Sequence, residues 1–275
     1  NTIGNSGESV HGISVDLTPP QMAISIDSLT SDSGLVGNDF ITNVGNVVLN
    51  GKLGAALGLG DKAQISLDGG TSWIDLVVNG TQWSYADGRT LEDGTHNYQV
   101  RVVDQAGNVG ATDSQNVVLD RVAPDASQSI IIDRISSDTG IADDDFITHS
   151  TTYSLEGRLG AGLNAGEHLQ IRINGGTWVE LEVNGTDWVY ANGTPLADGT
   201  YAYQLRVIDD AGNVGQTASK TVTVDTVRPD MANLVTITHI SEDSGLSDSD
   251  FITNYKTLTI HGSLVSTLQP GEYVQ

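Results

Sequence analysis

Cysteine is absent from this chain of 275 residues, which excludes disulfides, thiolate metal sites and thiol nucleophiles. Basic residues are also scarce: 12 Lys and Arg face 35 Asp and Glu, for a formal net charge of −23. Such a charge repels phosphate backbones and anionic lipid surfaces, so it argues against nucleic acid as a partner. No apolar run approaches the ~18 residues of a spanning helix, and we expect no membrane insertion in this segment.

Aromatic residues are few, and the three Phe residues reveal an internal repeat. Each stands in the sequence Asp-Phe-Ile-Thr, at Phe40, Phe146 and Phe251, so the spacings are 146 − 40 = 106 and 251 − 146 = 105 residues. The sequence Ala-Gly-Asn recurs in the same register, ending at Asn108 and Asn213. A fixed period of this size is the signature of tandem domains.

The repeat sets the expected domain boundaries, which fall at short linkers of the form Asp-x-x-x-Pro. Residues 21–123 and 124–228 are two full units. Residues 1–20 are interpreted as the last strand of a preceding unit, and residues 229–275 as the first half of a further unit. Because half a unit cannot bury a core, we expect the chain to be a slice of a longer array. Asn1 opens no secretory leader, so we expect export information to lie elsewhere or to be missing.

Within each unit the hydrophobic period is two, which indicates strands with one face in a core. Asn-Gly and Asp-Gly turns separate the strands, and no window of 11 residues has a convincing helical face. About seven short strands in about 105 residues predict an all-β chain of tandem immunoglobulin-like β-sandwiches. Trp83 and Trp188 are predicted to be core residues, and Tyr98 and Tyr203 occupy positions that resemble a tyrosine corner.

Trp73 and Trp178 stand apart from the other two tryptophans, because Trp178 shares its strand face with Glu180 and Glu182. We therefore expect partial exposure. Cross-strand packing in a hairpin is the favoured interpretation of both side chains. Stacking against a sugar is the alternative, and it makes Trp73 and Trp178 candidate glycan contacts.

The repeated carboxylates lie at predicted strand ends and in loops, whereas the six histidines share no repeat position. In a chain of sandwiches, the loop between the first two strands and the end of the last strand meet at the junction with the next unit. An isolated Asp in a loop most often makes a local turn, but a set that recurs in register favours a metal site. The candidate metal ligands are Asp16, Asp32, Asp39, Asp104, Asp120, Asp138, Asp145, Asp209, Asp225, Asp243 and Asp250.

Converging carboxylates need a counter-charge, because two like charges about 4 Å apart repel by roughly 4 kcal/mol at an effective dielectric near 20. Only Arg121 and Arg228 lie in the linkers. Ca²⁺ takes six to eight oxygen ligands and suits loops rich in Asp, Asn, Ser and Gly. Neither an EF-hand spacing nor a glycine-rich nonapeptide repeat is present, so the calcium prediction depends on the expected clustering.

Together, the Asp-x-Ala-Gly-Asn sequence, the Asp-x-x-x-Pro linker and the Asp-Ser-Gly…Asp-Phe-Ile-Thr pattern resemble the bacterial Ig-like domains of giant surface adhesins. The resemblance covers the whole chain. The sequence pattern is similar to that of non-fimbrial adhesins secreted by type I systems and of related biofilm proteins. It implies an elongated rod of tandem domains, Ca²⁺ near the junctions, a secreted or cell-surface location, and attachment to host cells or biofilm. Neighbouring repeats are then the partners of each domain.

The sequence is compatible with three functions to different degrees. The favoured one is a calcium-rigidified stalk that carries a binding tip located elsewhere in the protein. The alternative is a glycan-binding module that uses its exposed tryptophans on host-surface carbohydrate. An enzyme is disfavoured, because no nucleophile, phosphate loop or repeated His accompanies the carboxylates.

Overall fold

The computed structural model describes residues 12–139, 141–229, 235–268 and 271–274. These residues form strands, turns and bends without any helix, so the all-β prediction is confirmed for the described part of the chain. Contacts group them into two compact units. The first contains the described residues up to Ser136 with Tyr153–Asn192 and Tyr201–Val222, and the second contains Ser137–Thr152, Gly193–Thr200 and the described residues from Thr223 onward.

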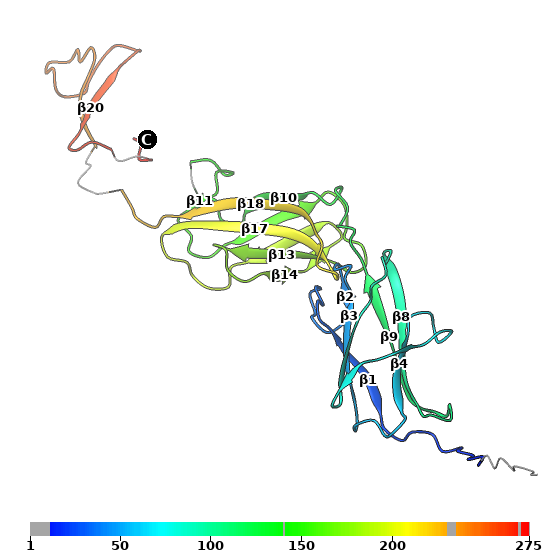
Figure 1. The fold of residues 1–275 in the computed structure, drawn as a ribbon. Coiled ribbons are helices and arrows are strands. Elements are labelled where there is room, and N and C mark those ends of the chain that lie inside the picture. The colour runs from blue at the N-terminus through cyan, green and yellow to red at the C-terminus, as the bar shows by residue number, and fades with distance from the viewer. Residues whose placement is uncertain (1–11, 140, 230–234, 269–270, 275) are drawn as a thin grey trace, which may run out of the picture. The chain divides into compact units, whose positions relative to one another are not determined.

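The first repeat is built from two sheets, as the alternating hydrophobic pattern predicts. The four-stranded sheet has the order β1-β3-β7-β6, with β1 Ile24–Leu29, β3 Val48–Leu53, β7 Gln82–Ala86 and β6 Val78–Asn79. The five-stranded sheet has the order β2-β9-β8-β4-β5, with β2 Ile41–Thr42, β9 Val109–Leu119, β8 Gly94–Val103, β4 Lys62–Ser66 and β5 Ile74–Asp75. The long pair β8 and β9 lies side by side in Figure 1.

The second repeat has the same strand orders. Its four-stranded sheet is β10-β12-β16-β15, with β10 Ile130–Ile135, β12 Ser154–Leu159, β16 Asp187–Ala191 and β15 Val183–Asn184. Its five-stranded sheet is β11-β18-β17-β13-β14, with β11 Ile147–Thr148, β18 Val214–Val224, β17 Gly199–Asp209, β13 Glu167–Ile173 and β14 Val179–Leu181. Further along the chain, β19 Val235–Ile240 pairs antiparallel with β20 Ile260–Leu264.

The core of each repeat contains one tryptophan, as predicted. Trp83 is 3% exposed and Trp188 is 1% exposed. Each indole lies against a glycine of the neighbouring strand: a Cβ added at Gly51 would stand 2.3 Å from the Trp83 ring, and one at Gly157 2.3 Å from the Trp188 ring. The indole therefore needs glycine at the facing position, because a methyl group there would overlap the ring.

The short strand β2 decides where the β1–β2 loop lies. It pairs parallel to the end of β9, with Ile41 opposite Val118 and Thr42 opposite Leu119. The pairing continues into the linker, because the Asp120 amide donates to the Thr42 carbonyl at 3.0 Å. The loop that carries Asp32 and Asp39 is thus fastened beside the linker that leads to the second repeat.

Tyr98 and Tyr203 are fully buried, but their hydroxyls bond to side chains rather than to the upstream backbone of a tyrosine corner. The Tyr98 hydroxyl donates to Asp87 Oδ2 at 2.7 Å, and the Tyr203 hydroxyl pairs with the Tyr153 hydroxyl at 2.8 Å. Arg89 Nη2 lies 2.6 Å from Asp87 Oδ2. Burial alone would raise the pKa of Asp87, but the hydrogen bonds from Arg89 and Tyr98 hold it below its ordinary value.

We expect Asp87→Asn to lower the free energy of unfolding by about 1–3 kcal/mol at pH 7, since a charged acceptor of buried hydrogen bonds is lost. A lowered folded-state pKa means that the stabilisation is present above the unfolded value of about 3.9 and is lost as the pH falls below it. The free energies of unfolding of the parent and of Asp87→Asn, measured in urea, should therefore differ at pH 7 and converge once the pH falls below the lowered pKa of Asp87.

The second repeat supplies the matched control for this prediction. Asn192 and Thr194 occupy the positions of Asp87 and Arg89, so Asn192→Asp places a carboxylate where no arginine stands. That variant should lose stability at pH 7 and recover it at low pH. If Asn192→Asp is as stable as the parent at pH 7, the carboxylate needs no arginine beside it, and the role assigned to Arg89 is contradicted.

Candidate functional site

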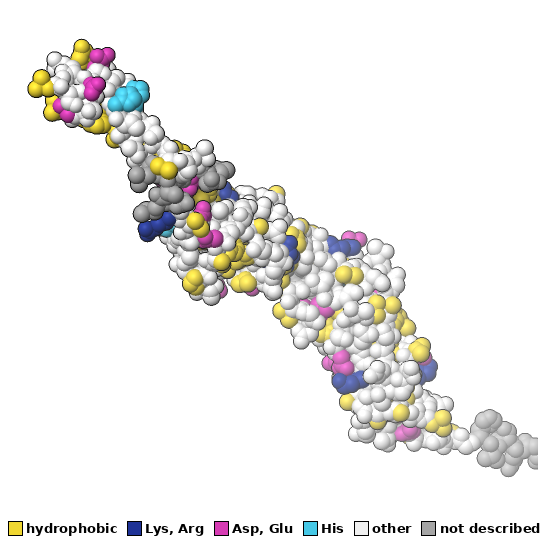
Figure 2. Space-filling model, turned by 90° about the vertical axis from the view of Figure 1, so that its left-hand side faces the viewer, with side chains coloured by type: hydrophobic (Ala, Val, Ile, Leu, Met, Phe, Trp, Pro, Cys, Tyr) yellow, Lys and Arg dark blue, Asp and Glu magenta, His cyan; other side chains and the backbone are white. Residues whose placement is uncertain are grey.

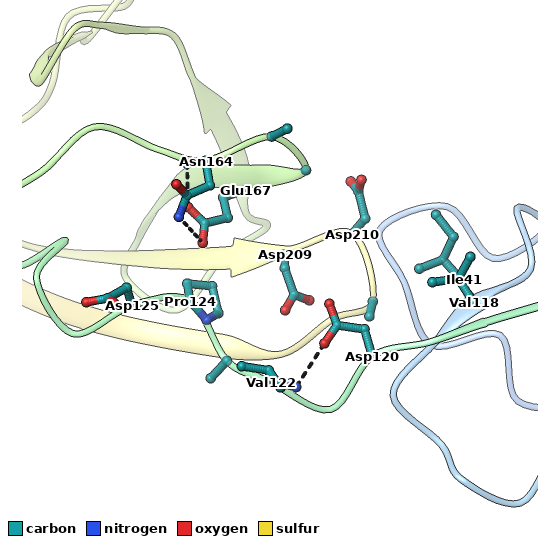
Figure 3. Close-up of a pocket in the computed structure, with 14 residues that line it drawn as sticks. Ile41, Val118, Asp120, Val122, Pro124, Asp125, Asn164, Glu167, Asp209 and Asp210 are labelled. Atoms are coloured by element: carbon teal, nitrogen blue, oxygen red, sulfur yellow. Dashed lines mark hydrogen bonds between the residues drawn. The ribbon is translucent and has the colours of Figure 1, made fainter. Parts of the chain in front are cut away.

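A cleft of about 420 Å³ lies beside the linker, within the first compact unit (Figure 3). The end of the first repeat contributes Ile41, Val118 and Asp120, and the linker contributes the stretch from Val122 to Asp125. The remaining walls come from the second repeat. Five carboxylates line this cleft: Asp120, Asp125, Glu167, Asp209 and Asp210.

Asp209, at the end of β17, is 7% exposed and is held by a single asparagine. Its Oδ1 accepts the backbone amide of Asn213 at 2.8 Å, and its Oδ2 accepts the Asn213 side-chain amide at 2.9 Å. The same Nδ2 donates to the Asp120 carbonyl at 2.9 Å. The Asn213 amide therefore joins the linker to the loop of the following repeat, and in Figure 3 the Asp120 and Asp209 carboxylates point toward one another.

The same arrangement recurs about 105 residues earlier. Asn108 donates its backbone amide to Asp104 Oδ1 and its Nδ2 to Asp104 Oδ2, both at 2.8 Å. That Nδ2 also donates to the Asp16 carbonyl at 3.0 Å. The side-chain amide of Asn108 holds the pKa of Asp104 below its ordinary value. We name this three-residue arrangement the linker clasp; its members are Asp16, Asp104 and Asn108, and Asp120, Asp209 and Asn213.

The β1–β2 loop holds a second pair of predicted residues. Asp32 Oδ2 accepts the amide of Phe40 at 3.1 Å, and Asp39 Oδ1 accepts the amide of Ile41 at 3.0 Å. Phe40 has φ of 63°, a left-handed conformation that is uncommon for a bulky residue. The other oxygen of Asp32, Oδ1, is buried and has no hydrogen-bond partner among the described residues. Burial and the neighbouring Asp39 carboxyl raise the pKa of Asp32.

The later copies of this loop repeat the geometry. Asp138 bonds the amide of Phe146 at 2.9 Å, and Asp243 bonds the amide of Phe251 at 3.1 Å. Both phenylalanines are left-handed, with φ of 62° and 60°. In each copy Oδ1 of the first aspartate is again buried without a partner in the described part of the chain. Asp145 and Asp250 accept the amides of Ile147 and Ile252, in the same way as Asp39.

Contacts between the β1–β2 loop and the second repeat lie within the first compact unit. Ser33 Oγ donates to the Ala211 carbonyl at 2.9 Å, and the Leu35 amide donates to the Asp210 carbonyl at 3.3 Å. A Cβ added at Gly34 would stand 2.2 Å from the Asp210 carbonyl oxygen, so only glycine fits there. The Asp-Ser-Gly sequence therefore makes the contact, and the Asp-x-Ala-Gly-Asn loop receives it.

The predicted ligands thus lie in the β1–β2 loop and its later copies, in the two linker clasps and, for Asp225, in the linker that follows the second repeat. Asp225 accepts the amide of Val227 at 2.9 Å, as Asp120 accepts that of Val122 at 2.9 Å. Within the described residues, no three His, Cys, Asp or Glu side chains are grouped closely enough to hold a metal ion. Calcium ligation by these residues stays a prediction. Ca²⁺ sites in proteins also take oxygen ligands from carbonyls, side-chain amides and water, in addition to carboxylates.

The sequence prediction missed Asp125, Glu167 and Asp210. The first repeat has Gln21 and Gln105 in place of Asp125 and Asp210. It has Asp61 at the position of Glu167, and both of these carboxylates accept a backbone amide three residues earlier in the chain.

The sequence prediction also missed the role of Ser33. The Ser33 hydroxyl contacts the second repeat and accepts the backbone amide of Asn43 at 2.9 Å. The repeated Asp-Ser/Thr-Gly sequence was the available signal for Ser33. Asn213 was signalled by the repeated Ala-Gly-Asn, although the sequence did not specify its bond to the linker carbonyl.

Trp73 and Trp178 are both half-buried, and both lie against arginine. The Arg101 guanidinium lies 4.0 Å from the centroid of the Trp73 ring. Arg172 and Arg206 lie 4.5 Å and 4.3 Å from that of Trp178. Cross-strand packing therefore accounts for the burial of both indoles, and contact with a glycan stays a prediction.

Comparison with known families assigns the class of the chain. A model of the bacterial Ig-like domain matches residues 18–121 and 125–226. Because these two matches cover most of the chain, the protein belongs to the bacterial Ig-like domain family. Domains of this family are typically extracellular modules, and the described residues contain no helix that could cross a membrane.

Solved structures with similarity to the chain come from tandem β-sandwich proteins. The fibronectin(III)-like modules of Clostridium thermocellum CbhA are 12% identical over 74% of this chain and 94% of that chain, with a TM-score of 0.41. The FN1-FN3 domains of chicken CNTN1 are 12% identical over 74% of this chain and 68% of that one, with a TM-score of 0.39. No curated protein matches the chain.

We expect Asn213→Ala to lower the free energy of unfolding of the second repeat by about 1–3 kcal/mol. The substitution leaves the buried Asp209 carboxylate without one donor and removes the bond to the Asp120 carbonyl. Thermal unfolding and amide hydrogen exchange of the 119–124 segment measure the two effects separately.

Asn116→Ala is the control, because among the described residues the Asn116 side chain bonds only the exposed Asn97 side chain across the sheet. It should leave exchange in the linker unchanged. If Asn213→Ala leaves it unchanged as well, the linker clasp does not order the linker.

Proposed function

We propose that this segment is part of the stalk of a secreted bacterial surface adhesin, stiffened by calcium at the β1–β2 loops and linkers. The observation that carries the proposal is the buried Oδ1 of Asp32, Asp138 and Asp243, which lacks a partner among the described residues in all three copies. A buried carboxylate oxygen without a donor is costly. A hard cation satisfies it, because Ca²⁺ binds carboxylate oxygens directly.

The charges around the loop support a cation rather than a protein counter-charge. Arg121, the basic residue of the linker, pairs with Asp93 at 2.7 Å and donates to the Leu91 carbonyl at 3.0 Å. It is therefore committed to its own repeat and does not compensate Asp32 and Asp39. A divalent ion held by these two carboxylates, with carbonyl and water oxygens, compensates both.

The linker supports a mechanical role. The stretch from Asp120 to Pro124 is short, contains proline and lacks glycine, and such linkers act as semi-rigid spacers. The linker clasp fastens its first carbonyl to the next repeat through Asn213. Repetition of one clasp at two successive linkers is suited to a spacer, because successive units are then restrained by the same contacts. These features of the linker favour a mechanical role of the segment over a catalytic one.

Calcium dependence also fits export. The carboxylates of the loop repel one another when no cation is bound, so a low-calcium cytosol keeps the segment less stable before secretion. Calcium outside the cell then favours the folded array, since a ligand that binds only the native state stabilises it. The proposed route is a type I system, and the proposed destination is the bacterial surface, where the adhesin attaches to host cells or biofilm.

We expect the effect of Asp32→Asn on stability to be opposite in sign without and with calcium. Without calcium it should raise the melting temperature slightly, because it removes a repulsion with Asp39 while an amide oxygen still accepts the Phe40 amide. With calcium at 100 times its Kd, the parent chain gains about 2.7 kcal/mol that the variant does not. Differential scanning calorimetry with and without calcium measures both effects.

Asp27→Asn is the matched control, since Asp27 pairs with Lys52 on the surface at 3.0 Å and lies outside the loop. It should respond to calcium as the parent does. Equal calcium responses of Asp32→Asn and the parent would remove Asp32 from the site.

Chelation tests the stiffening separately from stability. We expect small-angle scattering of the whole chain to show a broader distribution of dimensions in EDTA than in calcium, because the linkers regain hinge freedom. Magnesium, which needs strict octahedral geometry, should restore the calcium profile only in part. Superimposable profiles in calcium and EDTA would count against the proposal.

A further inference from the structure

One face of the five-stranded sheet in the second repeat carries a basic and aromatic cluster. Leu169 and Ile171 of β13 are buried, and the alternation places Gln170 and Arg172 on the opposite face. Arg206 of β17 lies opposite Gln170 in the register of the sheet. With Trp178, which precedes β14, the two arginines form what we call the Trp178 cluster: Arg172, Trp178 and Arg206.

The two arginines of the Trp178 cluster are held by neutral side chains. Arg206 Nε and Nη2 donate to Gln170 Oε1 at 3.0 Å and 2.8 Å, and Arg172 Nε donates to Gln204 Oε1 at 2.7 Å. Within the described part of the chain, neither guanidinium forms an ion pair with a carboxylate. Burial and the nearby Arg172 lower the pKa of Arg206. Two adjacent cations therefore face the cleft without an anion from the protein.

This lack of a carboxylate is notable in a chain with net charge −23. Several other arginines have a carboxylate partner: Arg89 pairs with Asp87 at 2.6 Å, and Arg158 pairs with Asp133 at 2.6 Å. Arg101, the counterpart of Arg206 in the first repeat, is instead held by Gln64 at 2.9 Å. Figure 2 shows several basic side chains beside acidic ones on the face it presents. Glu180, two residues after Trp178, is bonded instead to His168 at 2.7 Å.

A cleft of about 440 Å³ adjoins the Trp178 cluster. Its other walls carry amide and hydroxyl groups from Gln204, Thr217 and Ser219. The volume is in the range of small-ligand pockets, which run from about 300 to 1,000 Å³. The cleft thus combines paired guanidinium donors, an aromatic ring and neutral hydrogen-bonding groups.

We propose that this cleft binds a carboxylated sugar, whose carboxylate pairs with Arg172 and Arg206 and whose hydroxyls bond the polar wall. Guanidinium groups bind carboxylates in a bidentate manner, and arginine is the residue suited to it. The net charge of the chain favours a singly charged ligand, because a chain of charge −23 repels a polyanion more strongly than a singly charged sugar. Amide and hydroxyl groups match the hydroxyls of a sugar ring.

The first repeat contains a matched site that lacks one arginine. Trp73 and Arg101 occupy the positions of Trp178 and Arg206, each 105 residues earlier. Ser66 lies opposite Gln99, as Arg172 lies opposite Gln204. Because Ser66 is fully buried and bonds Asp68 at 2.8 Å, it cannot replace the missing cation. The proposal therefore assigns carboxylate binding to the second repeat and excludes the first.

The test is a titration of the whole chain with glucuronate, monitored by the NMR signals of the four indole N–H groups. Glucuronate should shift the Trp178 signal and leave the Trp73 signal in place, and glucose at equal concentration should shift neither. Glucose 6-sulfate should shift the Trp178 signal less than glucuronate does, and an equal response would overturn the assignment to a carboxylate. Equal responses to glucose and glucuronate would overturn the proposal, and so would a stronger response to a sulfated polysaccharide than to glucuronate.

Arg172→Gln should weaken glucuronate binding at least tenfold, while Arg134→Gln, which removes an arginine paired with Glu156 in the same repeat, should leave it unchanged. The melting temperature of each variant establishes that it is folded. Arg172→Lys keeps the charge and loses the bidentate geometry, so intermediate binding is expected. Binding unchanged in Arg172→Gln would overturn the proposal, and if that variant does not fold, unchanged binding in Arg172→Lys would do so.

Discussion

In both linker clasps, the side-chain amide of one asparagine joins the linker to the repeat that follows it. An asparagine amide has two N–H donors, and in the linker clasp its Nδ2 serves both the buried carboxylate of its own loop and the carbonyl of the preceding linker. The carboxylate fixes the orientation of the amide because it also accepts the asparagine backbone N–H. With its orientation fixed, the amide meets the linker carbonyl without losing further rotamer freedom, which limits the entropic cost of the contact.

The β1–β2 loop completes this arrangement from the other side. Its parallel pairing with the end of β9 fixes the loop beside the linker, and the same loop presents Ser33 and Gly34 to the Ala211 and Asp210 carbonyls. Two independent segments of the first repeat therefore contact one loop of the second. A contact made by two segments resists bending in more directions than a single linker bond does.

Much of the fold could be predicted from the sequence, because its signals are periodic. Alternation at period two identified the buried faces, and the repeat identified Trp83 and Trp188 as equivalent core residues. The repeat also indicated which carboxylates share a position. It could not show that Tyr98 bonds the Asp87 side chain, since Asn192 replaces Asp87 in the second repeat and the two hydroxyls take different partners.

The candidate sites were less predictable for a physical reason. The left-handed conformation of Phe40 follows from two aspartates that bond consecutive amides, and neither propensity nor periodicity reports such a bond. The Trp178 cluster depends on Arg172 and Arg206 meeting across two strands that are about 30 residues apart in the sequence. Pattern arguments identify the face of a strand, but they do not identify which side chains of neighbouring strands meet on it.

The two repeats agree in the residues of the linker clasp and differ on the open face of the five-stranded sheet. Asp104 and Asn108 match Asp209 and Asn213 in identity and in hydrogen bonding, whereas Ser66 and Arg172 share a position and differ in both size and charge. A side chain that fastens the linker is constrained by both of the repeats it joins. A side chain on an open sheet face is constrained only by its own repeat, so that face is where one unit of an array can acquire a ligand without altering the contacts that hold the linker.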